Sequence, residues 1–243
     1  MNTMAIEARV SGRSFHAVLA WTFVLVAIVG FAPRSIAIVG GTMPNPPLVV
    51  HLHAAVMASW TALLAVQSTL SLAGRPDLHR RVGKLALVVA PAVLVMLLAV
   101  TFSRQNAAFG TPAGPIVNNI LFLQIRSIVL FPLFFAWAWR TRRTDLQTHR
   151  RMMLMATLML LDAAIARMGF LPGNDFPRSY LAVHLYLLAL LIPALLHDLL
   201  TLGRIHRAWL LGLALVVPWV IGTELVWGTP WWQAFGPRLV GAG

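Results

Sequence analysis

Histidines at the edges of long apolar segments are the residues of this sequence most suited to chemistry. Seven of the eight histidines lie at such edges, and they fall into two groups. The first group is His51, His53 and His184, and the second is His79, His149, His197 and His206. Neutral imidazole binds haem iron, copper and zinc, and it exchanges protons near neutral pH. The pattern therefore predicts ligand or proton chemistry in two layers.

Other polar residues interrupt the same apolar segments and extend these layers. The layer of His53 also takes in Gln124, Arg126, Arg167 and Glu224, whereas Gln67 and Asp198 join the layer of His79. Asp162 lies between the layers. Ionisable groups inside a membrane span cost several kcal/mol, roughly, and they usually mark function.

Helical spacing indicates which of these side chains face the interior. His53, Trp60 and Gln67 are spaced seven residues apart and share one helix face, and the positions from His184 to Asp198 repeat in the same way. His51 and His53 differ by about 200° around a helix. We therefore expect His53 to point inward, with His51 at the surface or acting as a second metal ligand.

Three interpretations of the layers remain open. In the first, histidine pairs hold haem b: His53 with His184, and His79 with His149. Arg126 or Arg167 would then bind the propionates.

In the second interpretation, His51, His53 and His184 bind copper or zinc, with Glu224 as a further ligand. In the third, the layers form a structural network of ion pairs, for example Asp162 or Glu224 with Arg167. The methionines of residues 152–159 are expected to pack in the core rather than to bind Cu(I).

The elements that position these residues are membrane-spanning helices. The chain has 243 residues, 59% of them hydrophobic and 11% charged, with no cysteine. Soluble domains carry roughly 25% charged residues, so lipid is the expected solvent. We predict an all-α bundle of about seven spans forming a single membrane domain over residues 1–243. The spans are 15–38, 48–72, 84–103, 119–139, 152–171, 180–202 and 208–227.

Basic residues give this bundle a direction. With the N-terminus inside, 13 lysines and arginines fall in inner segments and 4 in outer ones. This split predicts an N-in, C-out protein of the bacterial inner membrane. The first span also resembles a signal peptide, but its length favours a retained helix. The net charge of +12 is spread over short loops, so lipid headgroups, not nucleic acids, are the expected partners.

The inner loops repeat one pattern. Residues 75–81 (RPDLHRR) are echoed by residues 143–151 (RTDLQTHRR) and more weakly by residues 203–207 (GRIHR). The repeat predicts helical hairpins, with Asp77 and Asp145 just ahead of helix starts.

The segments around these loops resemble a known group of proteins. Gln67, followed by LHRRVG at residues 78–83 and HRRMM at residues 149–153, resembles uncharacterised bacterial multi-pass membrane proteins with a Leu-His-Arg-x-x-Gly loop and a His-Arg-x-x-Met helix. The second half is also similar to membrane proteins of cytochrome-oxidase assembly and to cytochrome b561-like proteins. The resemblance implies a helical membrane fold with histidines as candidate ligands.

Two functional classes follow. The first is a haem- or copper-handling redox or assembly factor, working with a respiratory or other membrane complex. The second is a non-redox membrane protein, either a small transporter or a structural subunit. The chain contains no Walker loop, glycine-flanked nucleophilic serine, His-Glu-x-x-His or dinucleotide-binding pattern.

Overall fold

A computed structural model describes the backbone of residues 3–241 and the side chains of residues 14–241. Every regular element in the described part is helical. Six helical segments are long and apolar enough to cross a membrane: 14–39, 48–72, 86–108, 114–141, 181–202 and 207–226. The predicted class, an all-α multi-pass membrane bundle, is confirmed.

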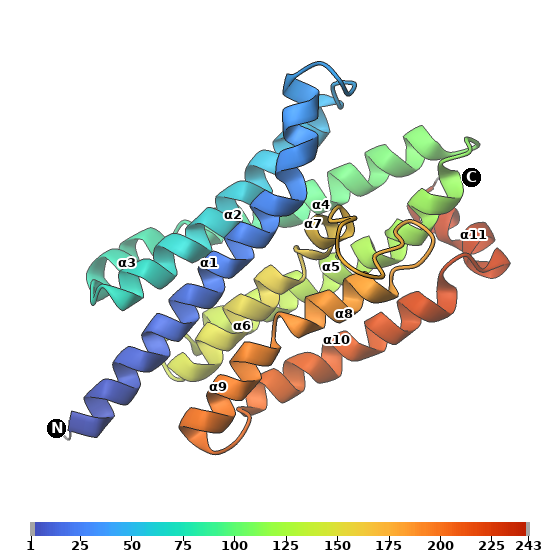
Figure 1. The fold of residues 1–243 in the computed structure, drawn as a ribbon. Helices are drawn as coiled ribbons and strands as arrows, with labels where there is room; N and C mark the ends of the chain where they lie inside the picture. The colour runs from blue at the N-terminus through green and yellow to red at the C-terminus, as the bar shows by residue number, and fades with distance from the viewer. Residues whose placement is uncertain (1–2, 242–243) are drawn as a thin grey trace.

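The long helices lie side by side along one axis (Figure 1). They are α1 (Thr3–Val39), α2 (Leu48–Leu72), α4 (Ala86–Ala108), α5 (Gly114–Thr141) and α10 (Arg207–Val226). Short α3 (Pro76–Gly83) joins α2 to α4 at one end, and α11 (Pro230–Phe235) with a 3-10 turn (Gly236–Val240) closes the other end.

Two further passes consist of broken helices. One is α6 (Leu146–Leu158) with α7 (Asp162–Ala166), and the other is α8 (Leu181–Ala189) with α9 (Ile192–Leu202). The predicted fifth span, 152–171, was expected to be one continuous helix, but the chain turns at residues 159–161 and leaves helical conformation after Ala166. Ser127 on α5 donates a hydrogen bond to the Met159 carbonyl oxygen at 2.8 Å, so a backbone group at the break is satisfied inside the protein.

The α6 helix lies at the centre of the bundle. Met152, Met155 and Met159 are fully buried, as the core-packing interpretation of the methionines requires. Trp60 of α2 reaches α6, where its indole N–H donates to the Thr157 hydroxyl at 3.0 Å. Trp60 therefore faces the interior, as the seven-residue spacing predicted.

The bundle has two chemically distinct ends. We call the end that holds residues 73–85, 140–151 and 203–207 the arginine end. The opposite end, with residues 40–47, 109–113, 167–180 and 227–241, is the tryptophan end. In Figure 1, α1 begins at the arginine end and the described chain finishes at the tryptophan end.

A close helix crossing holds α7 in place. A Cβ atom at Gly30 of α1 would lie 2.4 Å from the carbonyl oxygen of Ala164 in α7. No side chain fits at that distance, so glycine allows the two backbones to touch, as small residues do between membrane helices. This contact positions the start of α7, where Asp162 lies.

Candidate functional site: two buried arginine–aspartate networks

A charged network crosses the half of the bundle nearest the tryptophan end. Arg126 of α5 is fully buried, and its Nη2 donates to Oδ2 of Asp162 at 2.5 Å. Its Nη1 lies 3.3 Å from Nε2 of His184 on α8. Nδ1 of His184 lies 3.0 Å from Oε1 of Glu224 on α10. Four elements thus contribute one charged residue or histidine each.

The arginine determines the tautomer of His184. A guanidinium group has only N–H donors and stays protonated. Nε2 of His184 must therefore accept from Arg126 Nη1, which leaves the imidazole proton on Nδ1. That N–H donates to the Glu224 carboxyl group. His184 is consequently a neutral imidazole between a cation and an acid.

This network has unused hydrogen-bonding capacity. Nε of Arg126 is buried and has no hydrogen-bond partner. The Glu224 side chain is 29% exposed, whereas His184 is fully buried. Buried donors are nearly always paired, so an unpaired guanidinium N–H marks a site that is not optimised for stability. The network leads from the bundle surface at Glu224 to Asp162 in the interior.

Each broken helix contributes one residue to this network. Asp162 is the first residue of α7, directly after the break in α6–α7, and its Oδ1 accepts from the N–H of Ala163 at 2.8 Å. His184 lies on α8, one and a half turns before the break at residues 190–191. Tyr180 packs edge-on against His184 with ring centroids 4.9 Å apart.

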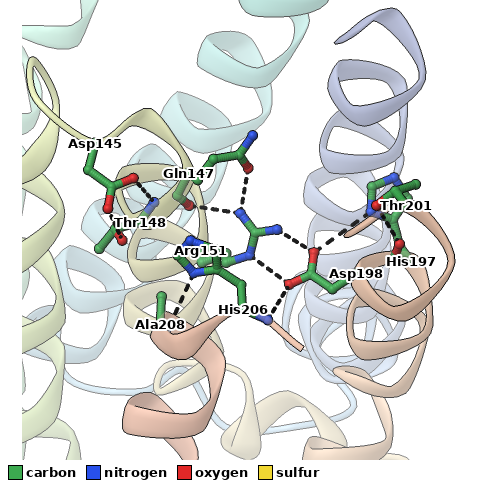
Figure 2. Close-up of polar contacts among 9 residues, drawn as sticks. All are labelled: Asp145, Gln147, Thr148, Arg151, His197, Asp198, Thr201, His206 and Ala208. Carbon is green, nitrogen blue, oxygen red and sulfur yellow. Dashed lines mark hydrogen bonds and ion pairs between the residues drawn. The ribbon is translucent and has the colours of Figure 1, made fainter. Parts of the chain in front are cut away.

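A second arginine–aspartate network lies near the arginine end (Figure 2). Nε of Arg151 on α6 donates to Oδ2 of Asp198 on α9 at 3.0 Å, and Nη2 of Arg151 pairs with Oδ1 of Asp198. Nη1 of Arg151 donates to the carbonyl oxygen of Gln147 at 3.0 Å and to its Oε1 at 2.6 Å. Asp198 also accepts from the backbone N–H of His206 at 3.1 Å. Every nitrogen of this guanidinium has a partner.

The inner histidines His79 and His149 have equivalent environments. Nδ1 of His79 lies 3.1 Å from the carbonyl oxygen of Gln67, and Nδ1 of His149 lies 2.9 Å from that of Ala138. Each ring thus lies against a carbonyl oxygen of the helix that precedes its loop, so the repeat seen in the sequence is also a structural repeat. Gln67 completes its motif: its amide oxygen accepts from the N–H of Gly83 at 2.7 Å, and its amide nitrogen donates to Nδ1 of His79 at 2.7 Å and to the His79 carbonyl oxygen at 3.0 Å.

The two aspartates of the repeat differ. Asp145 caps α6, accepting from the N–H of Thr148 at 3.0 Å and from its hydroxyl at 2.7 Å. Asp77 was expected at the same position but lies inside the first turn of α3 and pairs with Arg80. Pro76 explains the shift, since proline fits the first helical position and the helix starts there, two residues earlier than it would with Asp77 as its cap.

The outer histidines predicted to bind metal are only partly interior. His53 has a buried Nδ1 without a hydrogen-bond partner, whereas His51 is exposed and bonds to Asn45 at 2.8 Å. Both ring nitrogens of His184 are engaged by Arg126 and Glu224. Within the described side chains, no group of three or more His, Asp or Glu residues is arranged to hold a metal ion.

The predicted ion pairs with Arg167 do not form. Arg167 donates instead to the Ala163 carbonyl oxygen at 2.5 Å and lies 4.8 Å from the Phe31 ring. Five residues separate Arg167 from Asp162, so the two project from different sides of the chain. Asp162, which the sequence pattern placed between the two layers, is the partner of Arg126. The Arg151–Asp198 pair was also missed, although an arginine and an aspartate at one membrane level were a usable signal.

Comparison with known proteins adds no family to this geometry. No protein-family model, no curated protein and no solved structure matches the chain. The functional argument therefore depends on the two networks and the surfaces around them.

Proposed function

We propose that the chain is a proton-coupled membrane transporter whose coupling site is Arg126, Asp162, His184 and Glu224. One observation carries the proposal: a neutral imidazole lies between a buried guanidinium and a partly exposed carboxyl group. Chains of acidic residues and histidines in membrane interiors are typical of proton relays in pumps and transporters.

The broken helices support the same proposal. Discontinuous helices meet at the substrate and ion sites of many transporters, because their irregular backbone needs protein or water around it. Asp162 follows the break in α6–α7, and Ser127 satisfies a carbonyl at that break. The site thus lies beside a break in the regular helical backbone.

Protonation of His184 would act as a switch. A proton arriving through Glu224 converts His184 to imidazolium, which carries N–H groups at both ring nitrogens. Nε2 then presents a donor to the Nη1 donor of Arg126, 3.3 Å away, and two cations face each other. Arg126 must withdraw toward Asp162, its remaining partner. Loss of the proton from His184 restores the original contact.

In this proposal the protein lies in a bacterial inner membrane with its arginine end in the cytoplasm. Basic loops prefer the cytoplasmic side, and the tryptophan end provides interfacial aromatic residues. Trp231 is 61% exposed and stacks on Phe235 with ring centroids 5.3 Å apart. Glu224 then lies in the outer half of the bundle, so that protons enter from outside.

A pH jump tests the coupling site without a known substrate. Proteoliposomes adsorbed on a solid-supported membrane should give a transient current when the external pH falls, because protons move into the bundle. Glu224→Gln and His184→Gln should abolish at least about nine-tenths of the displaced charge. His51→Gln is the matched control, since His51 is an exposed histidine at the same end. Equal currents from wild type and both variants would refute proton coupling.

A second candidate function has its own observation. Nδ1 of His149 lies 2.9 Å from a backbone carbonyl oxygen, a contact that orients the ring and leaves Nε2 available to a ligand, and Nδ1 of His79 lies 3.1 Å from the corresponding carbonyl oxygen of Gln67. These two histidines could hold haem b at the arginine end. The purified protein would then show a Soret band that shifts with dithionite and disappears in His149→Ala. A colourless protein purified from haem-supplemented cells would exclude this candidate.

A further inference from the structure

Three arginines gather at the tryptophan end on helices far apart in the sequence. Arg34 lies on α1, Arg104 on α4 and Arg167 directly after α7. They account for three of the six arginines in the outer half, which is otherwise poor in basic residues; the others are Arg126, Arg178 and Arg238. We call Arg34, Arg104 and Arg167 the arginine cluster.

The crossing of α1 and α7 places two members of the cluster together. Gly30 and Ala164 touch at the crossing, where a glycine Cβ would lie 2.4 Å from the Ala164 oxygen. Arg34 follows Gly30 by four residues and Arg167 follows Ala164 by three, so each lies one turn beyond the contact. Both helices run toward the tryptophan end, and the Arg167 guanidinium lies 4.8 Å from the ring of Phe31 on α1.

Electrostatic contacts bring in the third arginine and a histidine. Arg104 and Arg34 are both close enough to Arg167 for their charges to repel it. The charge of Arg167 likewise acts on His53 of α2, whose Nδ1 is buried and has no hydrogen-bond partner. Arg34, Arg104 and His53 thus all lie within electrostatic range of Arg167.

The positive charge of this region has little compensation from the protein. Among the described side chains, no salt bridge includes Arg34, Arg104 or Arg167. Asp162 attracts Arg167, but its carboxylate already binds Arg126 at 2.5 Å. Like charges that gather without a counter-charge are stabilised by an anion, and guanidinium groups bind carboxylate and phosphate oxygens in pairs.

We propose that the arginine cluster, with His53, binds an oxyanion, the carboxylate or phosphate group of a ligand. This inference deepens the proposed function, on which it rests only for the statement that the oxyanion belongs to the transported substrate. Asp162 is close enough to Arg167 for the two charges to attract, so an anion held at the cluster would repel the Asp162 carboxylate that binds Arg126. Substrate binding and the Arg126 contact would thereby be linked.

Binding in nanodiscs tests the site separately from transport. The full chain in zwitterionic lipid is titrated with inorganic phosphate and with succinate, and binding is followed by calorimetry. Arg34→Gln and Arg104→Gln should each raise the dissociation constant at least about tenfold, which is the loss of affinity expected for one charge-assisted contact. Arg178→Gln and Arg238→Gln remove the same charge at the same end outside the cluster, and their affinities should stay within about twofold of wild type.

A second arm identifies the source of the oxyanion. A lipid headgroup occupies the cluster if two results are found together. Wild type in nanodiscs that contain anionic phospholipid no longer binds free phosphate and melts at a higher temperature than in zwitterionic lipid. Arg34→Gln shows the same melting temperature in both lipids. Absence of any wild-type response to phosphate, succinate or anionic lipid would overturn the proposal. Equal weakening in the Arg178→Gln control would overturn it too.

The two proposals can fail independently. Glu224→Gln should bind the anion with wild-type affinity, because Glu224 is not in the cluster. Anion binding without a pH-jump current would remove proton coupling and leave the oxyanion site. A pH-jump current without anion binding would remove the oxyanion site and leave proton coupling.

Discussion

The two buried arginine–aspartate pairs have the same chemistry, but they differ in how many of the arginine nitrogens are hydrogen-bonded. Arg151 near the arginine end uses all its nitrogens on Asp198 and Gln147, and Asp198 additionally fixes the backbone at His206. Arg126 near the tryptophan end has an unpaired Nε and a single oxygen contact with Asp162. We call the Arg151 pair saturated, because every guanidinium nitrogen has a partner, and the Arg126 pair unsaturated. A change in the saturated pair can only break a hydrogen bond, whereas the unsaturated pair has a free donor with which it can exchange partners.

The difference indicates a division of labour within one bundle. The Arg151 network joins α6 to α9 and to the start of α10, so it locks three passes at one end. The Arg126 network includes a histidine and a partly exposed carboxyl group, so its charges can change with protonation. We therefore assign stability to the first network and function to the second.

Breaking the saturated pair should give the largest effect. Asp198→Asn leaves the Arg151 charge uncompensated in a buried site, and we expect it to lower the free energy of unfolding by about 3–5 kcal/mol. Reversible unfolding in mixed detergent micelles measures the change. The double variant Arg151→Leu with Asp198→Leu should recover more than half of the loss, since it removes both charges. A double variant as unstable as Asp198→Asn would show that the pair is not the cause.

The same change in the unsaturated pair should cost less. Asp162→Asn also removes a carboxylate from a buried arginine, but Glu224 remains linked to Arg126 through His184. We expect a loss of about 2 kcal/mol, in the range for a hydrogen bond to a charged group. The pH-jump current should change as well. Equal destabilisation by Asp162→Asn and Asp198→Asn would contradict the division of labour.

The crossing that supports the functional network can be tested at Gly30. Gly30→Ala places a methyl group 2.4 Å from a backbone oxygen, so α1 and α7 must separate. Overpacking of this kind typically costs about 1–3 kcal/mol, and we expect about 1–2 kcal/mol here. The displaced charge after a pH jump should fall too, because Asp162 begins α7. The control is Ala54→Gly, on the exposed face of α2. A second glycine-to-alanine change such as Gly203→Ala is a poorer control, because the positive φ of 67° at Gly203 would strain any alanine there.

Much of the fold could be predicted from the sequence, because apolar length and helical spacing determine it. Six long apolar helices were located to within a few residues, and the inward positions of His53 and Trp60 follow from one spacing. The break in α6–α7 could not be predicted. Its cause is tertiary: Ser127 on another helix satisfies the Met159 carbonyl at the break, and Met159, Leu161 and Asp162 are buried.

The candidate site was recognised by its residue types but not by its pairing. Arg126, His184 and Glu224 were placed in one layer of the membrane, and the structure brings them together. Asp162 was separated from them because its depth was inferred from a continuous helix. The break moves Asp162 toward Arg126, while Arg167 turns away to Ala163. The depth of a residue along the bundle can be predicted from the sequence. Its ion-pair partner cannot, because the direction of its side chain around the helix axis changes wherever the helix is broken.

The smallest expected effect concerns the helix cap beside the saturated network (Figure 2). Hydrogen bonds from the Thr148 hydroxyl and backbone N–H hold the pKa of Asp145 below its ordinary value. Asp145→Ala should cost about 1 kcal/mol at neutral pH, as for other N-cap residues. A lowered folded-state pKa means that this contribution is complete above the unfolded value of about 3.9 and disappears as the pH falls through the folded value. The difference between wild type and Asp145→Ala should therefore shrink below about pH 4.

Asp77 provides the matched control for this cap. It occupies the corresponding place in the repeat but lies inside α3, in an exposed pair with Arg80. Exposed pairs contribute about 0–1 kcal/mol, so Asp77→Ala should change stability by less than Asp145→Ala at neutral pH. If both variants lower the free energy of unfolding by the same amount, the two loops would contribute to stability through their charge alone. If only Asp145→Ala has an effect, the cap belongs to the structural side of the comparison, since it starts the helix that carries Arg151.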